Sequence, residues 1–146
     1  MENIYKALEE DHKTQRELAR KLVETEGKSE TRQSIYNELK TELEAHAAAE
    51  EKYFYRPLMK YDKTLEHARH SVAEHKELDD ILEKLEDTKM DSSSWLKTAK
   101  HLKERLIHHV DEEEADVFPV AKKTIPKGDA QKLSEEFWDE KNKRAS

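Results

Sequence analysis

Apolar residues recur every three or four positions along most of the chain, which is the spacing of one face of an α-helix. The pattern predicts four long helices, each with one apolar stripe, and a short amphipathic segment that carries Leu133, Phe137 and Trp138. The charged tail, residues 139–146, is expected to fray. The four long helices are expected over about residues 3–27, 29–57, 62–91 and 92–119, with one or two further turns after the last.

The connections between these helices are short, which favours antiparallel neighbours. We therefore expect an all-α fold: an antiparallel up-down-up-down four-helix bundle with a short C-terminal fifth helix packed outside. The core bundle would take about residues 3–123, and the short helix and tail residues 126–146, within a single domain of residues 1–146. Only two glycines and three prolines interrupt the chain, in agreement with long helices.

Ionisable residues on the apolar stripes recur at a fixed interval of 63 residues (75 − 12, 109 − 46 and 113 − 50). Leucines and isoleucines superpose at the same interval, for example Leu39 on Leu102 and Leu43 on Leu106. The pattern indicates two copies of one helical hairpin that face each other. The repeated ionisable residues are His12, His46 and Glu50 in the first half and His75, His109 and Glu113 in the second.

Four histidines and two glutamates that face one core pose an electrostatic problem, because a buried unpaired carboxylate costs several kcal/mol. No lysine or arginine shares their stripe, so a bound cation is the natural counter-charge. The chain has no cysteine, so the ligands must be nitrogen and oxygen, a set that suits Fe, Mn or Zn. The alternative is a helical bundle whose histidines only fill polar core positions, but six ionisable groups at matching depth count against it.

One tyrosine and four further histidines are the remaining candidates for the site. Tyr53 follows Glu50 by almost one turn, so it is either a packing residue or a side chain in contact with the site. Four other histidines fall away from the face at 100° per residue and are expected outside the site. They are His67, His70, His101 and His108.

The charge and the N-terminal residues limit the partners. A formal net charge of −7, with acids and bases interspersed, counts against nucleic acid and against an anionic membrane. The first residues lack the pattern of a signal peptide, and no apolar run is long enough to span a bilayer. We expect a soluble, cytoplasmic protein.

Two stretches of the chain together resemble the hemerythrin-like domains with the His-His-Glu (HHE) cation-binding pattern. In the first half the match rests on Asp11-His12 and on His46 to Glu51, followed by aromatic residues and Pro57; in the second it rests on Glu74-His75 and on His109 to Pro119. The resemblance implies a bundle that encloses two non-heme iron ions with an oxo or hydroxo bridge. By position, His12 and His46 would serve one iron and His75 and His109 the other, with Glu50 and Glu113 as bridges.

The chain departs from oxygen-carrying hemerythrins at two positions. Ser71 stands where they have a further histidine, and Glu113 replaces an aspartate that comes five residues after its histidine. The coordination is therefore poorer in nitrogen, unless a π-bulge brings His70 inward or Tyr53 or a carboxylate substitutes. Otherwise the second iron would have an extra position for water or an exogenous ligand. This departure from the oxygen carriers counts against reversible oxygen carriage.

The function expected from these observations is that of a di-iron protein that meets a small diatomic ligand or peroxide. Oxygen binding or sensing, nitric oxide handling and peroxide reduction all fit, the redox reactions with an electron donor as partner. Iron or other metal-ion binding, storage or sensing without catalysis is the second reading. A metal-free helical interaction module is the third.

Overall fold

Each of three long helices begins at a side chain that caps it. Asn3, Ser29 and Ser92 each accept a hydrogen bond from the backbone N–H three residues further on, which satisfies a donor that the helix start leaves free. The computed structural model describes residues 2–145, and these are helical with no strand, which confirms the all-α prediction. The elements are α1 (Ile4–Val23), α2 (Glu30–Glu50), the π-helical segment η1 (Glu51–Tyr55), α3 (Arg56–Leu58), α4 (Asp62–Glu86), α5 (Ser93–Glu112), the π-helical segment η2 (Glu113–Val117), α6 (Phe118–Thr124) and α7 (Lys127–Ala145).

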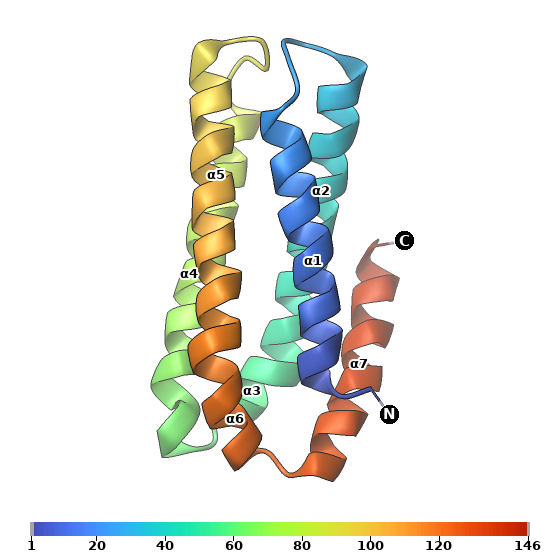
Figure 1. The fold of residues 1–146 in the computed structure, drawn as a ribbon, viewed down its shortest axis with the longest axis vertical. Helices are drawn as coiled ribbons and strands as arrows, with labels where there is room; N and C mark the ends of the chain where they lie inside the picture. Colours follow the sequence, from blue (N-terminus) through green and yellow to red (C-terminus); the bar gives the residue numbers. More distant parts are fainter. Residues whose placement is uncertain (1, 146) are drawn as a thin grey trace.

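Four long helices, α1, α2, α4 and α5, stand side by side, and the chain connects them at alternate ends (Figure 1). α1 ends at Val23, and the turn that follows contains Gly27 at a φ of 57°, a conformation that costs glycine least. α1 packs against α2 and α5, and α4 packs against α5. None of the helices within residues 2–145 is both long and apolar enough to cross a membrane.

Two π-helical segments interrupt the helices where the sequence predicted straight α-helix. η1 and η2 each close with a hydrogen bond from residue i+5 to residue i, from Arg56 N–H to the Glu51 carbonyl and from Phe118 N–H to the Glu113 carbonyl. A proline follows each segment within two residues, and a proline ring collides with the carbonyl four residues before it. The wider π turn gives that ring room and continues the helix past Pro57, where the second predicted helix was expected to end.

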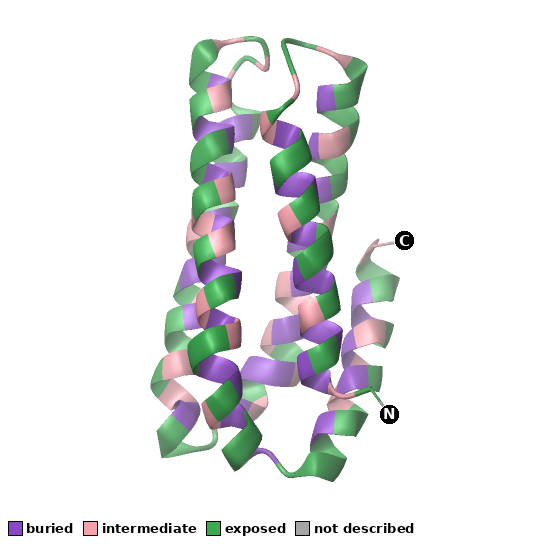
Figure 2. Cartoon of the chain, viewed as in Figure 1, coloured by how far each residue is buried: buried purple, intermediate pink, exposed green. Residues whose placement is uncertain are grey.

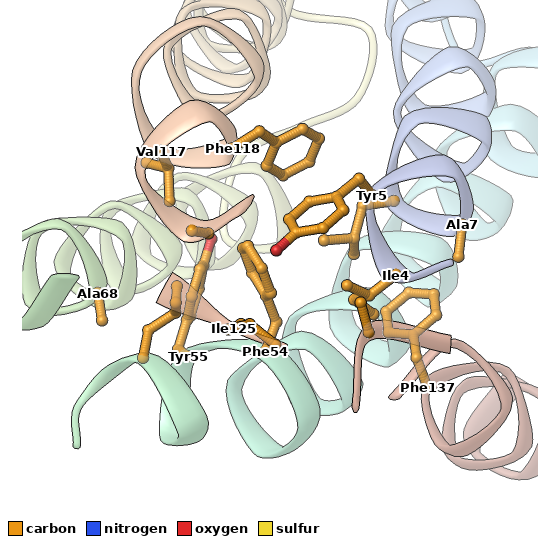
Figure 3. Packing of buried hydrophobic residues seen from close by; sticks show 14 of the residues in the cluster. Ile4, Tyr5, Ala7, Phe54, Tyr55, Ala68, Val117, Phe118, Ile125 and Phe137 are labelled. Atoms are coloured by element: carbon orange, nitrogen blue, oxygen red, sulfur yellow. The ribbon is translucent and has the colours of Figure 1, made fainter. Parts of the chain in front are cut away.

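The buried side chains form two apolar clusters with a layer of ionisable residues between them. Along α1, for example, one cluster contains Ile4, Tyr5, Ala7 and Leu8 and the other contains Leu18, Ala19 and Leu22, with His12 between them. Buried positions accordingly line the facing sides of the helices (Figure 2). In the first cluster the rings of Tyr5, Phe54 and Phe118 meet edge to face, with centroids 5.3–5.9 Å apart (Figure 3).

The C-terminal helix differs from the prediction of a short helix with a frayed tail. α7 continues to Ala145 and packs against α1 and α2. The Lys141 side chain is buried and pairs with the Asp11 and Glu42 carboxylates, the latter at 2.7 Å. Buried Phe137 packs against the ring of His46, with centroids 5.5 Å apart. Residues 139–145 remain helical and pack on the bundle, where Lys141 and Glu140 have charged partners on other elements, which composition alone does not reveal.

Candidate metal centre

All six predicted ligand residues lie in the ionisable layer between the two apolar clusters. None of them exposes more than 5% of its surface, so the side chains are out of contact with bulk water. They come from four helices and the first residue of η2: His12 from α1, His46 and Glu50 from α2, His75 from α4, His109 from α5 and Glu113 from η2.

Each glutamate lies between two imidazoles that belong to different helices. Glu50 Oε1 is 3.3 Å from His46 Nε2 and 3.0 Å from His75 Nε2. Glu113 Oε1 is 3.3 Å from His12 Nε2, and its Oε2 is 3.9 Å from His109 Nε2. The side chains form two groups whose possible ligand atoms all lie within 4.8 Å of one another, and Glu50 is common to both. The groups are His12, His46 and Glu50, and Glu50, His75 and His109.

A second carboxylate holds the outer nitrogen of every site histidine. In each case Nδ1 faces a carboxylate oxygen at 2.7–3.0 Å, which leaves Nε2 directed at the glutamates. This is the arrangement that orients metal-bound histidines and raises their basicity. The pairs are His12–Glu114, His46–Asp11, His75–Glu51 and His109–Glu74.

These outer carboxylates are residues that the sequence analysis did not assign to the site. They obey the same 63-residue repeat, since Asp11 corresponds to Glu74 and Glu51 to Glu114. The 63-residue repeat was therefore the feature of the sequence that could have identified these carboxylates. Each carboxylate precedes a site histidine or follows a site glutamate, yet it binds a histidine of another helix, so the pairing emerges only from the packing.

Seven atoms at the centre are buried and have no hydrogen-bond partner among the described residues. They are Nε2 of all four histidines, both carboxylate oxygens of Glu50 and Oε1 of Glu113. Some of these atoms are at ion-pair distance from one another, but not in hydrogen-bonding geometry. A buried polar atom left unpaired costs about 1–3 kcal/mol. Seven such atoms in one layer therefore indicate a partner that they share. Imidazole nitrogen and carboxylate oxygen are ligands that iron, manganese and zinc accept, and the donor set fits such ions.

The electric field of the layer favours positive charge. Burial opposes charging of the His46 imidazole, but Glu50 and Asp11 outweigh it and raise the pKa of His46 to about 10. In the same way Glu50 and Glu51 raise the pKa of His75 to about 9. Burial and the nearby Glu50 raise the pKa of the Glu113 carboxyl. Without a metal ion, the layer therefore holds protons that a metal ion would displace.

Tyr55, and not Tyr53, reaches the centre. The Tyr55 hydroxyl is buried and donates a hydrogen bond to Glu113 Oε2, whereas Tyr53 is only half-buried and packs its ring near Lys52. In a straight α-helix, Tyr55 would lie about 140° around from Glu50. The π turn of η1 removes that offset. Burial and the Glu113 carboxylate raise the pKa of Tyr55 well above 10, so the hydroxyl keeps its proton.

The second half has no equivalent hydroxyl, because Phe118 occupies the position 63 residues after Tyr55. His70 does not turn inward: its side chain is 56% exposed and its Nε2 pairs with Glu112 at 2.8 Å. The π segments occur after the glutamates and not at His70, so they do not recruit it. His101 and His108 are exposed and His67 is half-buried, as expected for residues outside the site.

Three of the four outer carboxylates have a cation on their far side. Lys141 pairs with Asp11, Arg16 lies 3.3 Å from Glu114 Oε1, and Arg105 lies 3.7 Å from Glu74 Oε2. Within residues 2–145, Glu51 makes no ion pair with a lysine or arginine. The residue that corresponds to Arg16 in the repeat is Asp79, which repels it.

A depression of the surface lies next to the centre on the side near Glu51. This depression, of about 480 Å³, is bordered by Glu51, Arg56 and Arg144 among other residues, and a cavity of about 10 Å³ lies further in. Ala47 and Asp79 border both spaces, so they mark a route from solvent toward the histidines. The inner cavity is lined by Gln15, Leu43, His46, Ala47, His75, Leu78, Asp79, Leu106 and His109.

Comparisons with known proteins agree with this centre. The family profile described as Hemerythrin HHE cation binding domain matches residues 3–121. The fold resembles the crystal structure of a Hemerythrin HHE cation binding domain-containing protein, the Rv2633c homolog from Mycobacterium kansasii, with a TM-score of 0.89 and 27% sequence identity over 99% of this chain and 88% of that chain. No curated protein sequence matches the chain significantly. Because the family profile spans most of the sequence, the chain belongs to the hemerythrin HHE cation-binding domain family.

Proposed function

We propose that the chain is a di-iron protein that binds or reacts with a small ligand such as oxygen, nitric oxide or peroxide. In this proposal an antiparallel up-down-up-down four-helix bundle holds two iron ions in its ionisable layer. His12 and His46 would hold one ion and His75 and His109 the other, with Glu50 and Glu113 as bridges.

The observation that carries the proposal is the set of seven buried atoms of ligand type that have no hydrogen-bond partner. In addition, a carboxylate contacts Nδ1 of each of the four histidines. Core histidines that merely satisfy polar positions would use both ring nitrogens in hydrogen bonds within the protein. Here Nδ1 is used in all four histidines, whereas Nε2 faces a glutamate and makes no hydrogen bond. Two-ion occupancy is supported by the two groups of ligand atoms that share Glu50.

The chain's own residues define the conditions for such chemistry. Bound iron ions supply one-electron redox chemistry and positions for an exogenous ligand. The apolar clusters on both sides exclude water and lower the local dielectric, which strengthens every interaction with charge in the layer. Tyr55 keeps a proton at its hydroxyl oxygen, next to Glu113.

The dimensions of the inner cavity limit the ligand. At about 10 Å³ the cavity is close to the lower limit for one water molecule, so it leaves space for a very small ligand and not for a large organic substrate. Redox turnover would also need an external electron donor.

Metal binding without catalysis, as in iron storage or sensing, is the second candidate. The cost of the unpartnered atoms in the layer favours it, because metal occupancy then controls the stability of the whole fold.

Two measurements test the proposal. Protein expressed in iron-replete medium and purified without chelators should contain two irons per chain, and one zinc with no iron would refute the di-iron assignment. The reduced protein is then mixed with oxygen in a stopped-flow spectrometer. A persistent oxygenated species supports binding, rapid irreversible oxidation supports redox chemistry, and the absence of any optical change supports a storage or structural role.

A further inference from the structure

Gln15 stands out in the layer because it is polar, buried and without a function in the centre described so far. It lies on α1, one turn after His12, and exposes 1% of its surface. Its side-chain nitrogen Nε2 is buried and has no hydrogen-bond partner among the described residues. A buried N–H donor that bonds to nothing destabilises the fold by about as much as a lost hydrogen bond, so its presence needs another explanation.

The surroundings of Gln15 suggest that explanation. Gln15 borders the cavity of about 10 Å³ that His46, His75 and His109 also line. Apart from this glutamine and the site histidines, the wall is made largely of apolar side chains. An exogenous ligand in this space would meet the unpartnered amide of Gln15 and the centre at the same time.

The internal repeat shows that the amide is not required by the packing. The cavity wall contains the repeat pairs His46 and His109, and Leu43 and Leu106, in which both halves carry the same residue type. The third pair is Gln15 and Leu78, which both line the cavity but differ in type. A leucine is therefore compatible with this layer in one half, and the glutamine places an amide donor where the other half has an apolar side chain.

We infer that the Gln15 side chain donates a hydrogen bond to the small ligand in this cavity and so selects ligands that accept one. The inference rests on the proposed function, since it requires a ligand at the centre. It assigns Gln15 a role in positioning and specificity, with no role in holding the metal.

The test uses the full chain loaded with iron, reduced, with nitric oxide as the diatomic probe. The variant is Gln15→Leu, which installs the residue of the repeat counterpart, and the matched control is Gln33→Leu, the same change at an exposed position of α2. A hydrogen bond to the ligand contributes about 1 kcal/mol, equivalent to about fivefold in the dissociation constant. Gln15→Leu should therefore weaken nitric oxide binding by about fivefold, mainly through faster dissociation, and raise the N–O stretching frequency in the infrared.

Two further readouts separate this role from a structural one. Iron content should be the same in both variants and in the unmodified chain. Because the variant removes an unpaired buried donor, the iron-free Gln15→Leu protein should melt at the same temperature as the unmodified protein or higher. Gln33→Leu should change neither binding nor the infrared spectrum.

The outcomes also separate the inference from the proposed function. If the unmodified chain binds two irons and nitric oxide, and Gln15→Leu leaves both the dissociation rate and the N–O frequency unchanged, the role of Gln15 is refuted while the proposed function stands. If the iron-loaded chain does not bind nitric oxide at all, the ligand-binding function fails, and the role of Gln15 with it. A lower melting temperature for iron-free Gln15→Leu would assign the glutamine to structure.

Discussion

The two nitrogens of each site histidine have opposite environments. Nδ1 faces an outer carboxylate, whereas Nε2 faces the centre and has no hydrogen-bond partner in the described chain. A neutral imidazole has one donor and one acceptor nitrogen, so the carboxylate selects the tautomer with the proton on Nδ1. The lone pair of Nε2 is then available to a metal ion. At the scale of single residues, the outer carboxylates orient the histidines toward the centre, and the glutamates connect the two halves.

Substitutions of the six inner residues should separate terminal ligands from bridges. His46→Ala and His109→Ala should each release about one of two irons, because each histidine belongs to one of the two groups. Glu50→Ala and Glu113→Ala should lower total iron further, because each glutamate lies between histidines of both groups. Metal analysis of the purified proteins measures this, with His108→Ala as the exposed control that should retain full iron. Loss of iron from His108→Ala, with His109→Ala unaffected, would contradict the assignment of helix faces.

The Tyr55 hydroxyl should stabilise the iron-free layer through Glu113. Tyr55→Phe removes the donor and leaves a buried carboxylate oxygen with one partner fewer, which we expect to lower the free energy of unfolding by about 1–3 kcal/mol. Urea unfolding of the iron-free proteins measures the difference. Tyr53→Phe, the same change two residues away on a half-buried side chain, should stay within about 0.5 kcal/mol of the unmodified protein. Equal effects of the two changes would show that the Tyr55 hydroxyl contributes nothing specific.

At the scale of elements, the two halves are alike in their inner ionisable residues and different in the residues around them. η1 and η2 follow α2 and α5 at nearly the same place, but only η1 delivers a hydroxyl to the centre. Arg16 pairs with the outer carboxylate of one half, and Asp79 takes its place in the other. The inner cavity adjoins the surface depression between α2 and α4, and Ala47 borders both spaces where the other half has the larger Val110.

A bulky residue at Ala47 should obstruct this approach. Ala47→Phe is expected to slow association of nitric oxide several-fold and to weaken its binding, because Ala47 borders both the outer depression and the inner cavity that would hold the ligand. Stopped-flow mixing with the reduced, iron-loaded protein measures the rates of association and dissociation. Ala48→Phe is the matched control, since Ala48 borders the outer depression but not the inner cavity. Unchanged rates in Ala47→Phe would show that ligands enter elsewhere.

At the scale of the whole molecule, metal binding, protonation and folding are linked through one buried layer. The layer lies between two apolar clusters, so a charge there that lacks a partner is costly to the fold as a whole. α7 adds to this arrangement from outside, because Lys141 neutralises Asp11 and Phe137 covers His46. Stability should therefore depend on which cations, protons or metal ions, occupy the centre.

The iron-free protein should lose stability as the pH rises above neutral. His46 and His75 have folded-state pKa values of about 10 and about 9, above the ordinary value of 6.5. A raised pKa contributes stability that is complete below about pH 6.5 and is lost as the pH rises through the folded-state pKa. The raised pKa of Glu113 acts in the same direction at lower pH, so mild acid should partly restore the iron-free fold.

Urea unfolding between pH 6.5 and 9.5 measures this dependence. We expect the free energy of unfolding of the iron-free protein to fall by about 1 kcal/mol or more per pH unit. The iron-loaded protein should be more stable throughout and should vary less over this range, because metal ions replace the protons. Below about pH 4.5 the sign reverses, since the pKa values of Asp11 and Glu114 are lowered and their contributions are lost on acidification. Equal stability of both forms near neutral pH would contradict a buried metal centre.

The sequence alone determined the helical class, and it singled out six ionisable residues that the structure brings together in one buried layer. Periodicity is local information: apolar spacing fixes the inward face of each helix, and the 63-residue repeat places His12 and His75, or Glu50 and Glu113, at equal depth. Helix starts at Asn3 and Ser29 were predictable for the same reason, since a cap acts within one turn.

The tertiary structure decided whatever depends on contacts between helices. The histidine partners Asp11 and Glu51 act across helices, Tyr55 replaces Tyr53 because a π turn shifts the register, and the C-terminal residues fold as a helix because Lys141 finds carboxylates on α1 and α2. None of these follows from spacing along one helix. Each depends on which side chains of different elements meet in the interior, where an unpaired charge or hydrogen-bonding group is too costly to remain without a partner.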